Sequence, residues 1–388
     1  MQFSQIIGHQ QIKHHFIQSV TEQRIPHAQM ISGREGVGKL RLALSYAQYI
    51  SCTKRTESDA CGVCPSCVKY AKLAHPDLHF VFPYPKPEGS KTWVCNDFVQ
   101  QFREMILKNE YFGIDDWNSF IASGDSKKQS YIFAGESEEI IRKLNLKSYE
   151  SEYKIVIIWL PEKMFGDIVA NKILKILEEP PAKTVFLLVS NQPDLLLPTI
   201  ISRTQPVYVH PLTESEIVQV LLKNGVSGIA QEHLQRIAHI ADGSALNALK
   251  IAANDTDNAA HFENFTNLMR AAWRCGAKKE YGALKDLRTW SENIAATGGR
   301  EQQKKFLNFA QKMLRENYMF NLNQPELNYL TLGEETFCAK FARFIHEKNV
   351  EKMMDEFALA EQQINQNANP KIVFFDLALK MIMMLKEN

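Results

Sequence analysis

The feature that most constrains the fold is a glycine-rich loop with a lysine, GREGVGKL at residues 33–40. A short strand is expected at residues 29–32 before it, and aliphatic residues at helical spacing follow it to about Ile50. Strand, loop and helix in this order form a phosphate-binding loop, whose backbone N–H groups and lysine hold phosphates. The pattern therefore predicts an α/β domain built around a nucleotide site.

Two parts of a working nucleotide site are missing. The Ser or Thr that should follow Lys39 and hold Mg²⁺ is Leu40. The strand expected at residues 155–158 should end in a metal-binding Asp and a catalytic Glu, but Trp159 and Leu160 stand there. We interpret Glu162 as an acid at the start of the next helix rather than a replacement carboxylate. Hydrolysis is therefore not expected, while Lys39 leaves weak nucleotide binding open.

The first half of the chain predicts a five-stranded parallel sheet covered by helices on both faces. Five apolar runs are expected to be its strands: residues 29–32, 78–82, 155–158, 185–189 and 207–209. The unbroken apolar character of the third and fourth runs is typical of strands buried on both faces. Poor periodicity at about 83–135 indicates an insertion, with some helix near 98–107.

Beyond Pro211 the strand signal ends, and the pattern becomes helical. Three short helices are expected near residues 214–223, 229–240 and 244–253, and longer helices from about 257 onward. We therefore expect three domains: an α/β core at 1–211, a small helical domain at 212–256 and an all-helical domain at 257–388. The core would carry a cysteine module at 52–67 and the insertion at about 83–135.

Four of the seven cysteines cluster: Cys52, Cys61, Cys64 and Cys67. In a cytosolic chain this C-x8-C-x2-C-x2-C spacing indicates a metal site rather than disulfides. Four thiolates suit tetrahedral Zn²⁺ and leave no open position, so the predicted site is structural. An iron–sulfur cluster and unligated thiols are the alternatives. The other three cysteines, Cys95, Cys275 and Cys338, are expected to be inert buried thiols.

The charge balance excludes some functions. A net charge of +1 with 23% charged residues gives no overall field for free-standing nucleic-acid binding. The N-terminus lacks a basic region followed by an apolar core, and no run approaches the ~18 apolar residues of a membrane span. We expect a cytoplasmic protein without a membrane partner.

The ordered motifs resemble the bacterial DNA polymerase III clamp-loader family of AAA+ ATPases, and most closely its delta-prime class. Besides the loop and the cysteines, four segments carry the resemblance: PHA at 26–28, NKILKILEEPP at 171–181, PTIISRT at 198–204 and NANPK at 367–371. Together they cover nearly the whole chain except the insertion. The resemblance implies an AAA+ core with a small helical lid, and a helical collar through which five subunits associate.

The resemblance also implies roles for single residues. Arg203 stands in Ser-Arg-Thr where the family has Ser-Arg-Cys, and is expected to act as an arginine finger in a neighbouring subunit's ATP site. Leu246 stands where hydrolysing members carry an arginine that senses the γ-phosphate, and Asn191 is a candidate relic of the polar sensor. The phosphate loop is then vestigial, with ATP binding in doubt at its residues Gly33, Gly36, Gly38 and Lys39.

The function implied is a non-hydrolysing subunit of the clamp loader, a component of the DNA polymerase III holoenzyme. Its partners would be the gamma/tau and delta subunits, with the sliding clamp and primer–template DNA reached through the assembly. Two alternatives stay open. An ATP-hydrolysing gamma/tau-like subunit would have to hold Mg²⁺ without Leu40, Trp159 or Leu160. A zinc-dependent nucleic-acid-binding module would need a basic face, whereas Lys, Arg, Glu and Asp mix around the cysteines.

Overall fold

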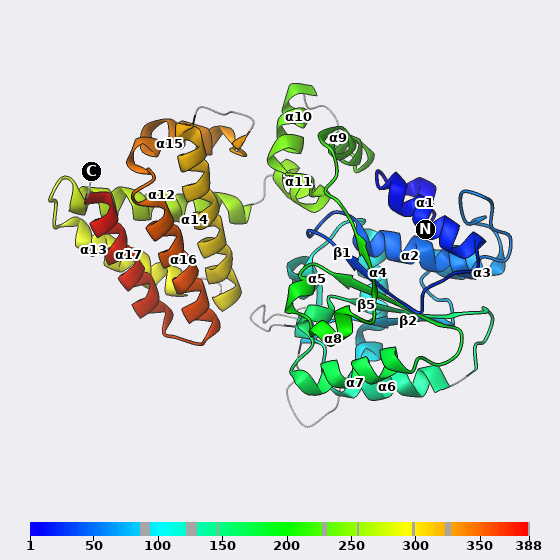
Figure 1. Cartoon of the computed structure of the whole chain (residues 1–388). Coiled ribbons are helices and arrows are strands. Elements are labelled where there is room, and N and C mark those ends of the chain that lie inside the picture. The colour runs from blue at the N-terminus through cyan, green and yellow to red at the C-terminus, as the bar shows by residue number, and fades with distance from the viewer. Residues whose placement is uncertain are drawn as a thin grey trace. The chain divides into compact units, whose positions relative to one another are not determined.

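The computed structural model describes residues 1–85, 94–121, 130–145, 147–226, 231–253, 256–296, 299–322 and 327–386. The chain divides into two compact units, Met1–Leu249 and Lys250–Asn388. The colour change from blue to green follows the first unit in Figure 1, and the yellow to red helices belong to the second. The finer division into domains at 1–211, 212–256 and 257–388 stays a prediction.

The first unit is built on a five-stranded sheet in which every pair of neighbouring strands is parallel. The strands, in spatial order, are β2 (Leu78–Val81), β5 (Lys154–Trp159), β6 (Thr184–Ser190), β1 (Ala28–Ser32) and β7 (Gln205–Tyr208). All residues of β1, β5 and β6 are buried, as the unbroken apolar runs at 155–158 and 185–189 predict for β5 and β6. The phosphate-loop strand β1 lies between the last two sheet strands in chain order, and the sheet has the five parallel strands that the sequence predicts.

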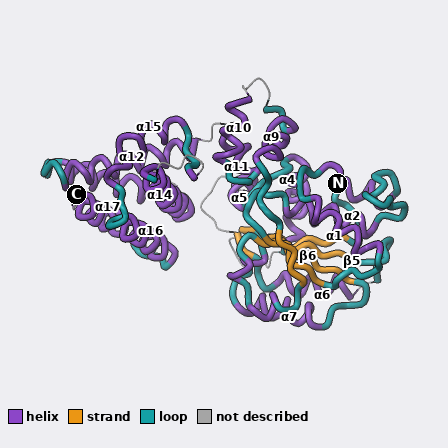
Figure 2. Tube along the Cα trace, turned by 45° about the horizontal axis from the view of Figure 1, so that its top comes forward, coloured by secondary structure: helices purple, strands orange, loops and turns teal. Residues whose placement is uncertain are grey.

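Helices cover both faces of this sheet, visible as purple tubes around the orange strands in Figure 2. Those of the core are α1 (Gln10–Thr21), α2 (Lys39–Ser51), α3 (Pro65–Ala71), α4 (Val99–Lys108), α5 (Ile114–Ile121), α6 (Gly135–Asn145), α7 (Asp167–Glu178) and α8 (Pro198–Ile201). α6 and α7 lie side by side on one face, and α2 packs on the other (Figure 1). α7 begins after Gly166, whose φ is +80°.

Two aromatic residues of the insertion, Phe102 and Trp117, belong to the hydrophobic core of this unit. The described residues of the insertion form the predicted helix α4 and also α5, which the sequence pattern does not reveal. Phe102 of α4 stacks on Phe82 with a ring-centroid distance of 4.0 Å and also meets Trp117 of α5 at 5.3 Å. Trp117 Nε1 donates a hydrogen bond to the Pro83 carbonyl at 2.7 Å. The parts of the insertion at 86–93 and 122–129 lie outside the described residues.

Two further strands border the insertion. β3 (Tyr84–Pro85) pairs antiparallel with β4 (Ser130–Tyr131), so the described ends of the insertion meet in a short ribbon separate from the main sheet. Ile132, just after β4, forms an isolated bridge with Met164. These pairings join the insertion to the segment that precedes α7.

Three short helices follow the sheet where the sequence predicts them: α9 (Glu214–Lys223), α10 (Gln231–Ile240) and α11 (Ala245–Ala252). A capping box begins α9, because Thr213 Oγ1 accepts from the Glu216 N–H and Glu216 Oε2 accepts from the Thr213 N–H. Ile217 and Val220 are fully buried in this part of the chain. We call α9 to α11 the lid helices.

The second unit consists of α12 (Thr256–Gly276), α13 (Ala283–Ala296), α14 (Gly299–Asn321), α15 (Leu332–Phe341), α16 (Val350–Asn365) and α17 (Pro370–Lys386). Its core is rich in aromatic residues, including Phe306, which meets Trp290 at 5.8 Å and Phe374 at 6.2 Å. Among its described residues there are helices and loops but no strand, so the predicted all-helical domain is confirmed. None of the helices in the described ranges is both long and apolar enough to span a membrane.

Candidate functional site

The phosphate loop forms hydrogen bonds with its own lysine. Gly36 and Gly38 have φ values of +79° and +93°, conformations that residues with a Cβ rarely adopt. Lys39 begins α2, and its Nζ donates to the Gly33 carbonyl at 2.7 Å and to the Arg34 carbonyl at 2.5 Å. The side chain is only 5% exposed, and burial lowers the pKa of Lys39 to about 8. The lysine that should reach a phosphate therefore donates hydrogen bonds to loop carbonyls instead.

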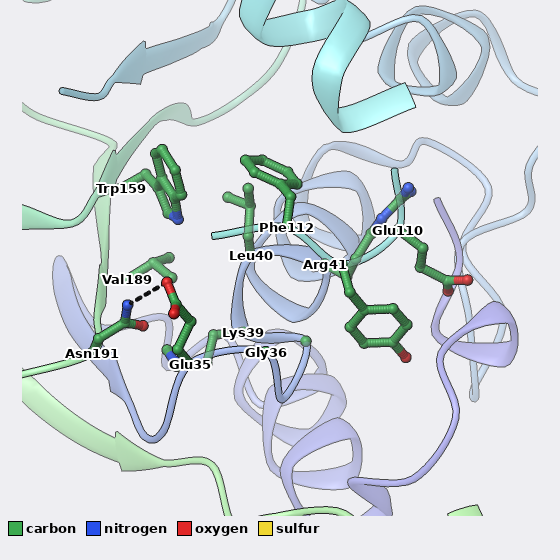
Figure 3. Close-up of a pocket in the computed structure, with 12 residues that line it drawn as sticks. Glu35, Gly36, Lys39, Leu40, Arg41, Glu110, Phe112, Trp159, Val189 and Asn191 are labelled. Carbon is green, nitrogen blue, oxygen red and sulfur yellow. Dashed lines mark hydrogen bonds between the residues drawn. The ribbon is translucent and has the colours of Figure 1, made fainter. Parts of the chain in front are cut away.

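The metal side of the pocket is apolar. Leu40, Trp159 and Val189 line it, and Figure 3 shows Leu40 and Trp159 gathered with Phe112 away from Glu35 and Asn191. Trp159 is the last residue of β5 and Leu160 follows it buried, with a φ of +55°. The strand therefore ends in side chains without an oxygen at the position where Mg²⁺ ligands are expected.

Glu162 lies in a 3-10 turn, Pro161–Lys163, rather than at the start of an α-helix. Its carboxylate accepts hydrogen bonds from Ser190 Oγ and from the Asn191 N–H, both at 2.8 Å. These bonds fix the turn that follows β6. Glu162 thus stands at the start of this 3-10 turn, and Gly166 separates the turn from α7.

The lid helices touch the phosphate loop directly. Ser244 Oγ donates to the Glu35 carbonyl at 2.9 Å, and the Leu246 N–H donates to the Gly36 carbonyl at 3.4 Å. Arg34 of the loop pairs with Asp242 at 2.5 Å. Leu246, at the expected position of a γ-phosphate-sensing arginine, packs so closely that a Cβ added at Gly36 would lie 2.6 Å from its Cβ.

The candidate sensor residue Asn191 follows β6 and lines the same pocket. Its Nδ2 donates to Glu35 Oε1 at 3.4 Å, drawn as a dashed line in Figure 3. A carboxylate from the loop itself is thus the hydrogen-bond partner of the amide that would face a nucleotide phosphate.

Arg203 lies far from its own phosphate loop. It precedes β7, and Gln205 pairs in parallel with Gln29 of β1. The phosphate loop leaves the opposite, carboxyl end of β1, about 13 Å from Gln29 at 3.3 Å per strand residue. The guanidinium forms an ion pair with Glu178 at 2.6 Å and donates to the Thr199 carbonyl at 3.1 Å. The side chain of Arg203 is 37% exposed.

The four clustered cysteines converge on one point. All four are free, and their sulfur atoms lie within 4.8 Å of one another: Cys52, Cys61, Cys64 and Cys67. Measured sulfur-to-sulfur distances are 3.6 Å for Cys52 and Cys61, 4.0 Å for Cys52 and Cys64, and 3.9 Å for Cys61 and Cys67. A tetrahedron of Zn–S bonds of about 2.3 Å has sulfur edges of about 3.8 Å. The cluster therefore has the geometry to hold a metal ion.

Backbone donors surround these sulfurs. The Cys61 N–H points at Cys52 Sγ, the Cys64 N–H at Cys61 Sγ and the Cys67 N–H at Cys64 Sγ, at 3.3–3.5 Å. Such donors favour the thiolate form that binds metals. The module also holds the N-terminus, because Asp59 accepts hydrogen bonds from the N–H groups of Phe3 and Ser4.

A family model described as "DNA polymerase III, delta subunit" matches residues 8–213, just over half of the chain. The chain belongs to this family. Relatives named DNA polymerase III subunit delta' confirm the delta-prime resemblance. The Bacillus subtilis protein is 28% identical over 237 residues, 61% of this chain and 57% of its own length. The Pseudomonas aeruginosa protein is 27% identical over 225 residues, 58% and 55% respectively.

This delta-prime family member spans about half the length of the curated delta' relatives it matches. It is also similar to DNA polymerase III subunit gamma/tau of Mycobacterium tuberculosis, at 26% identity over 202 residues, 52% of this chain and 27% of that protein. Among solved structures, a gamma subunit-related protein of DNA polymerase III from Thermotoga maritima aligns over 96% of this chain and 99% of its own. The identity is 14% and the TM-score 0.40.

Sequence reasoning missed part of the pocket of this family member. Residues 110–112 of the insertion and Arg41 of α2 line it together with the loop, although no motif marks them. Arg41 Nη2 donates to the Ile106 carbonyl at 2.7 Å, which brings the end of α4 to the start of α2. The only signal in the sequence is the aromatic pair Tyr111 and Phe112, whose spacing indicates no site.

Proposed function

We propose that the chain is a non-hydrolysing, delta-prime-like subunit of the DNA polymerase III clamp loader. In this role it completes the ring formed with gamma/tau and delta subunits, and it contacts the sliding clamp and primer–template DNA through the assembly. The family match and the relatives named delta' support this reading. As part of the holoenzyme, the chain serves catalysis in a neighbouring subunit rather than in its own pocket.

The apolar metal side of the pocket carries the non-hydrolysing part of the proposal. ATP hydrolysis by phosphate-loop enzymes needs Mg²⁺ between the β- and γ-phosphates, held by a hydroxyl after the loop lysine and an acid at a strand end. Leu40 and Trp159 occupy those two positions, and Trp159 is 5% exposed. A hydrocarbon and an indole supply no oxygen ligand, so the chain lacks the electrostatic stabilisation that the reaction requires.

Arg203 is the residue that we propose to act in the neighbour's site. Arg203 precedes the amino end of β7, whereas its own phosphate loop follows the carboxyl end of β1. Its guanidinium is partly exposed to solvent. An exposed ion pair such as Arg203–Glu178 contributes at most about 1 kcal/mol, so its release is a small barrier. Once released, the guanidinium stabilises charge on the transferred phosphoryl group, an effect worth about 10³–10⁵ in rate at that site.

We further propose that the four-cysteine cluster holds a structural zinc ion. Four thiolates with tetrahedral sulfur distances and no open position favour Zn²⁺ over ions that prefer oxygen ligands. The ion would close the loop between α2 and α3 and, through Asp59, fix the first residues of the chain. It supplies folding energy rather than chemistry.

The test is an assembly of this chain with ATPase and clamp-opening subunits. ATP turnover is compared for wild type, Arg203→Ala and the control Arg24→Ala, whose side chain is 83% exposed and lies in the same unit. We expect Arg203→Ala to assemble normally and lose turnover at the adjacent site, while Arg24→Ala behaves as wild type. Unchanged turnover with Arg203→Ala would remove the assigned role. Turnover by the purified chain alone would favour the gamma/tau-like alternative.

A further inference from the structure

The described middle of the insertion lies against the phosphate loop. The end of α4 is attached to the start of α2 through the hydrogen bond from Arg41 Nη2 to the Ile106 carbonyl, with the Asn109 carbonyl 3.5 Å from the same nitrogen. Because Arg41 stands two residues after Lys39, this contact holds the insertion next to the loop. We call residues 106–113 the stopper segment.

Two aromatic rings of the stopper segment face the pocket. Tyr111 is only 8% exposed, and a Cβ added at Gly38 would lie 3.3 Å from its Cε1, so the ring packs on bare loop backbone. The Phe112 ring lies 5.2 Å from the Trp159 ring, on the metal side of the pocket (Figure 3). The segment therefore covers both the loop and the position where a metal ion would be held.

The stopper segment also meets the loop carboxylate. A Cβ added at Gly113 would lie 2.5 Å from Glu35 Oε1, so the two touch closely. Glu35 and the rest of the lining leave a cavity of about 40 Å³. This space admits only small groups such as water molecules.

We propose that the stopper segment is a built-in occupant of the nucleotide pocket, which keeps the phosphate loop and the lid helices closed without any ligand. The inference goes beyond the proposed function, because it concerns the state of this chain's own pocket and not the role of Arg203. The insertion then has a role of its own, since Tyr111 and Phe112 take the place beside the loop that phosphates and metal take in a working site. The loop is held by protein contacts instead of by nucleotide.

The experiment compares the full chain as wild type, as the double variant Tyr111→Ala/Phe112→Ala and as Phe120→Ala. Phe120 is a matched control, since it belongs to the same insertion but is 37% exposed and does not line the pocket. Hydrogen exchange is followed at the amides of residues 33–41, and binding of ADP without Mg²⁺ is measured by calorimetry. Near-ultraviolet circular dichroism checks that each variant is folded, and Arg41→Ala serves as a second way to release the segment.

We expect loop amides of the double variant and of Arg41→Ala to exchange at least about tenfold faster than in wild type. ADP should bind the double variant at least about tenfold more tightly, because a pocket open less than a tenth of the time loses that factor in apparent affinity. Phe120→Ala should behave as wild type in both assays. Loop exchange that is no faster after release would overturn the inference. Equal ADP binding by wild type and double variant, including none by either, would also overturn it.

Discussion

The contact between the phosphate loop and the lid helices makes a quantitative prediction for Gly36→Ala. Two costs add at this position. A residue with a Cβ at a φ of +79° loses about 1–2 kcal/mol relative to glycine. The new Cβ would also lie 2.6 Å from Leu246 Cβ and press against Ser244 Oγ, and such overpacking costs about 1–3 kcal/mol.

Gly225→Ala separates the two costs. Gly225 has a φ of +83°, close to that of Gly36, but a Cβ added there meets no atom within 4 Å. It should therefore lose only the conformational part, and Gly36→Ala should be less stable than Gly225→Ala by about 1–3 kcal/mol. For a unit of about 250 residues this is a difference of about 2–12 °C in the midpoint of thermal unfolding.

Calorimetry of the two variants measures this difference, and hydrogen exchange locates it. Gly36→Ala should accelerate exchange of the Leu246 amide, which donates to the Gly36 carbonyl, while Gly225→Ala should not. Equal midpoints for the two variants, together with unchanged exchange at Leu246, would refute the conclusion that the lid helices rest on the loop.

Three further predictions concern the metal site, a buried carboxylate and the arginine. Wild type should carry one zinc ion per chain by atomic emission and Cys61→Ser should lose it, whereas Cys275→Ser, outside the cluster, should keep it. Burial opposes ionisation of Asp77, yet N–H donors at 149–151 outweigh it and lower its pKa. Asp77→Asn should therefore lose about 2–4 kcal/mol of unfolding free energy near neutral pH. Denaturant unfolding of wild type and Asp77→Asn at several pH values measures this loss of unfolding free energy. The loss should be complete above about pH 4 and should shrink as the pH falls through the lowered pKa of Asp77. Glu178→Gln should leave ATP turnover of the assembly at or above the wild-type rate, since its pair with Arg203 is exposed; a lower rate would mean that Glu178 positions the guanidinium.

The sequence predicts most helices and strands of this protein well, because the patterns that indicate them are local. Strands β5 and β6 each extend one residue beyond the predicted apolar run at both ends. The lid helix α9 has the predicted bounds, since the two residues of its capping box, Thr213 and Glu216, are close in the sequence. Helix α5 escaped detection, because its eight residues lie in a stretch whose turns and aromatics obscure the period.

The candidate site divides in the same way. Spacing alone brings the cysteines into one short segment, so their convergence could be predicted from the sequence. The losses at Leu40 and Trp159 could also be read from their order after a loop and a strand. The opposite positions of Arg203 and the phosphate loop depend on strands that run parallel, and thus on how the sheet assembles.

By itself the sequence determined the α/β core, the helical second half, the cysteine cluster and a phosphate loop without metal ligands, because periodicity and spacing act over a few residues. The tertiary structure decided which segments pack against that loop. Contacts between Arg41 and Ile106, Gly38 and Tyr111, and Gly36 and Leu246 join positions 65 to 210 residues apart. No local pattern encodes such contacts, since each depends on the packing of several elements at once.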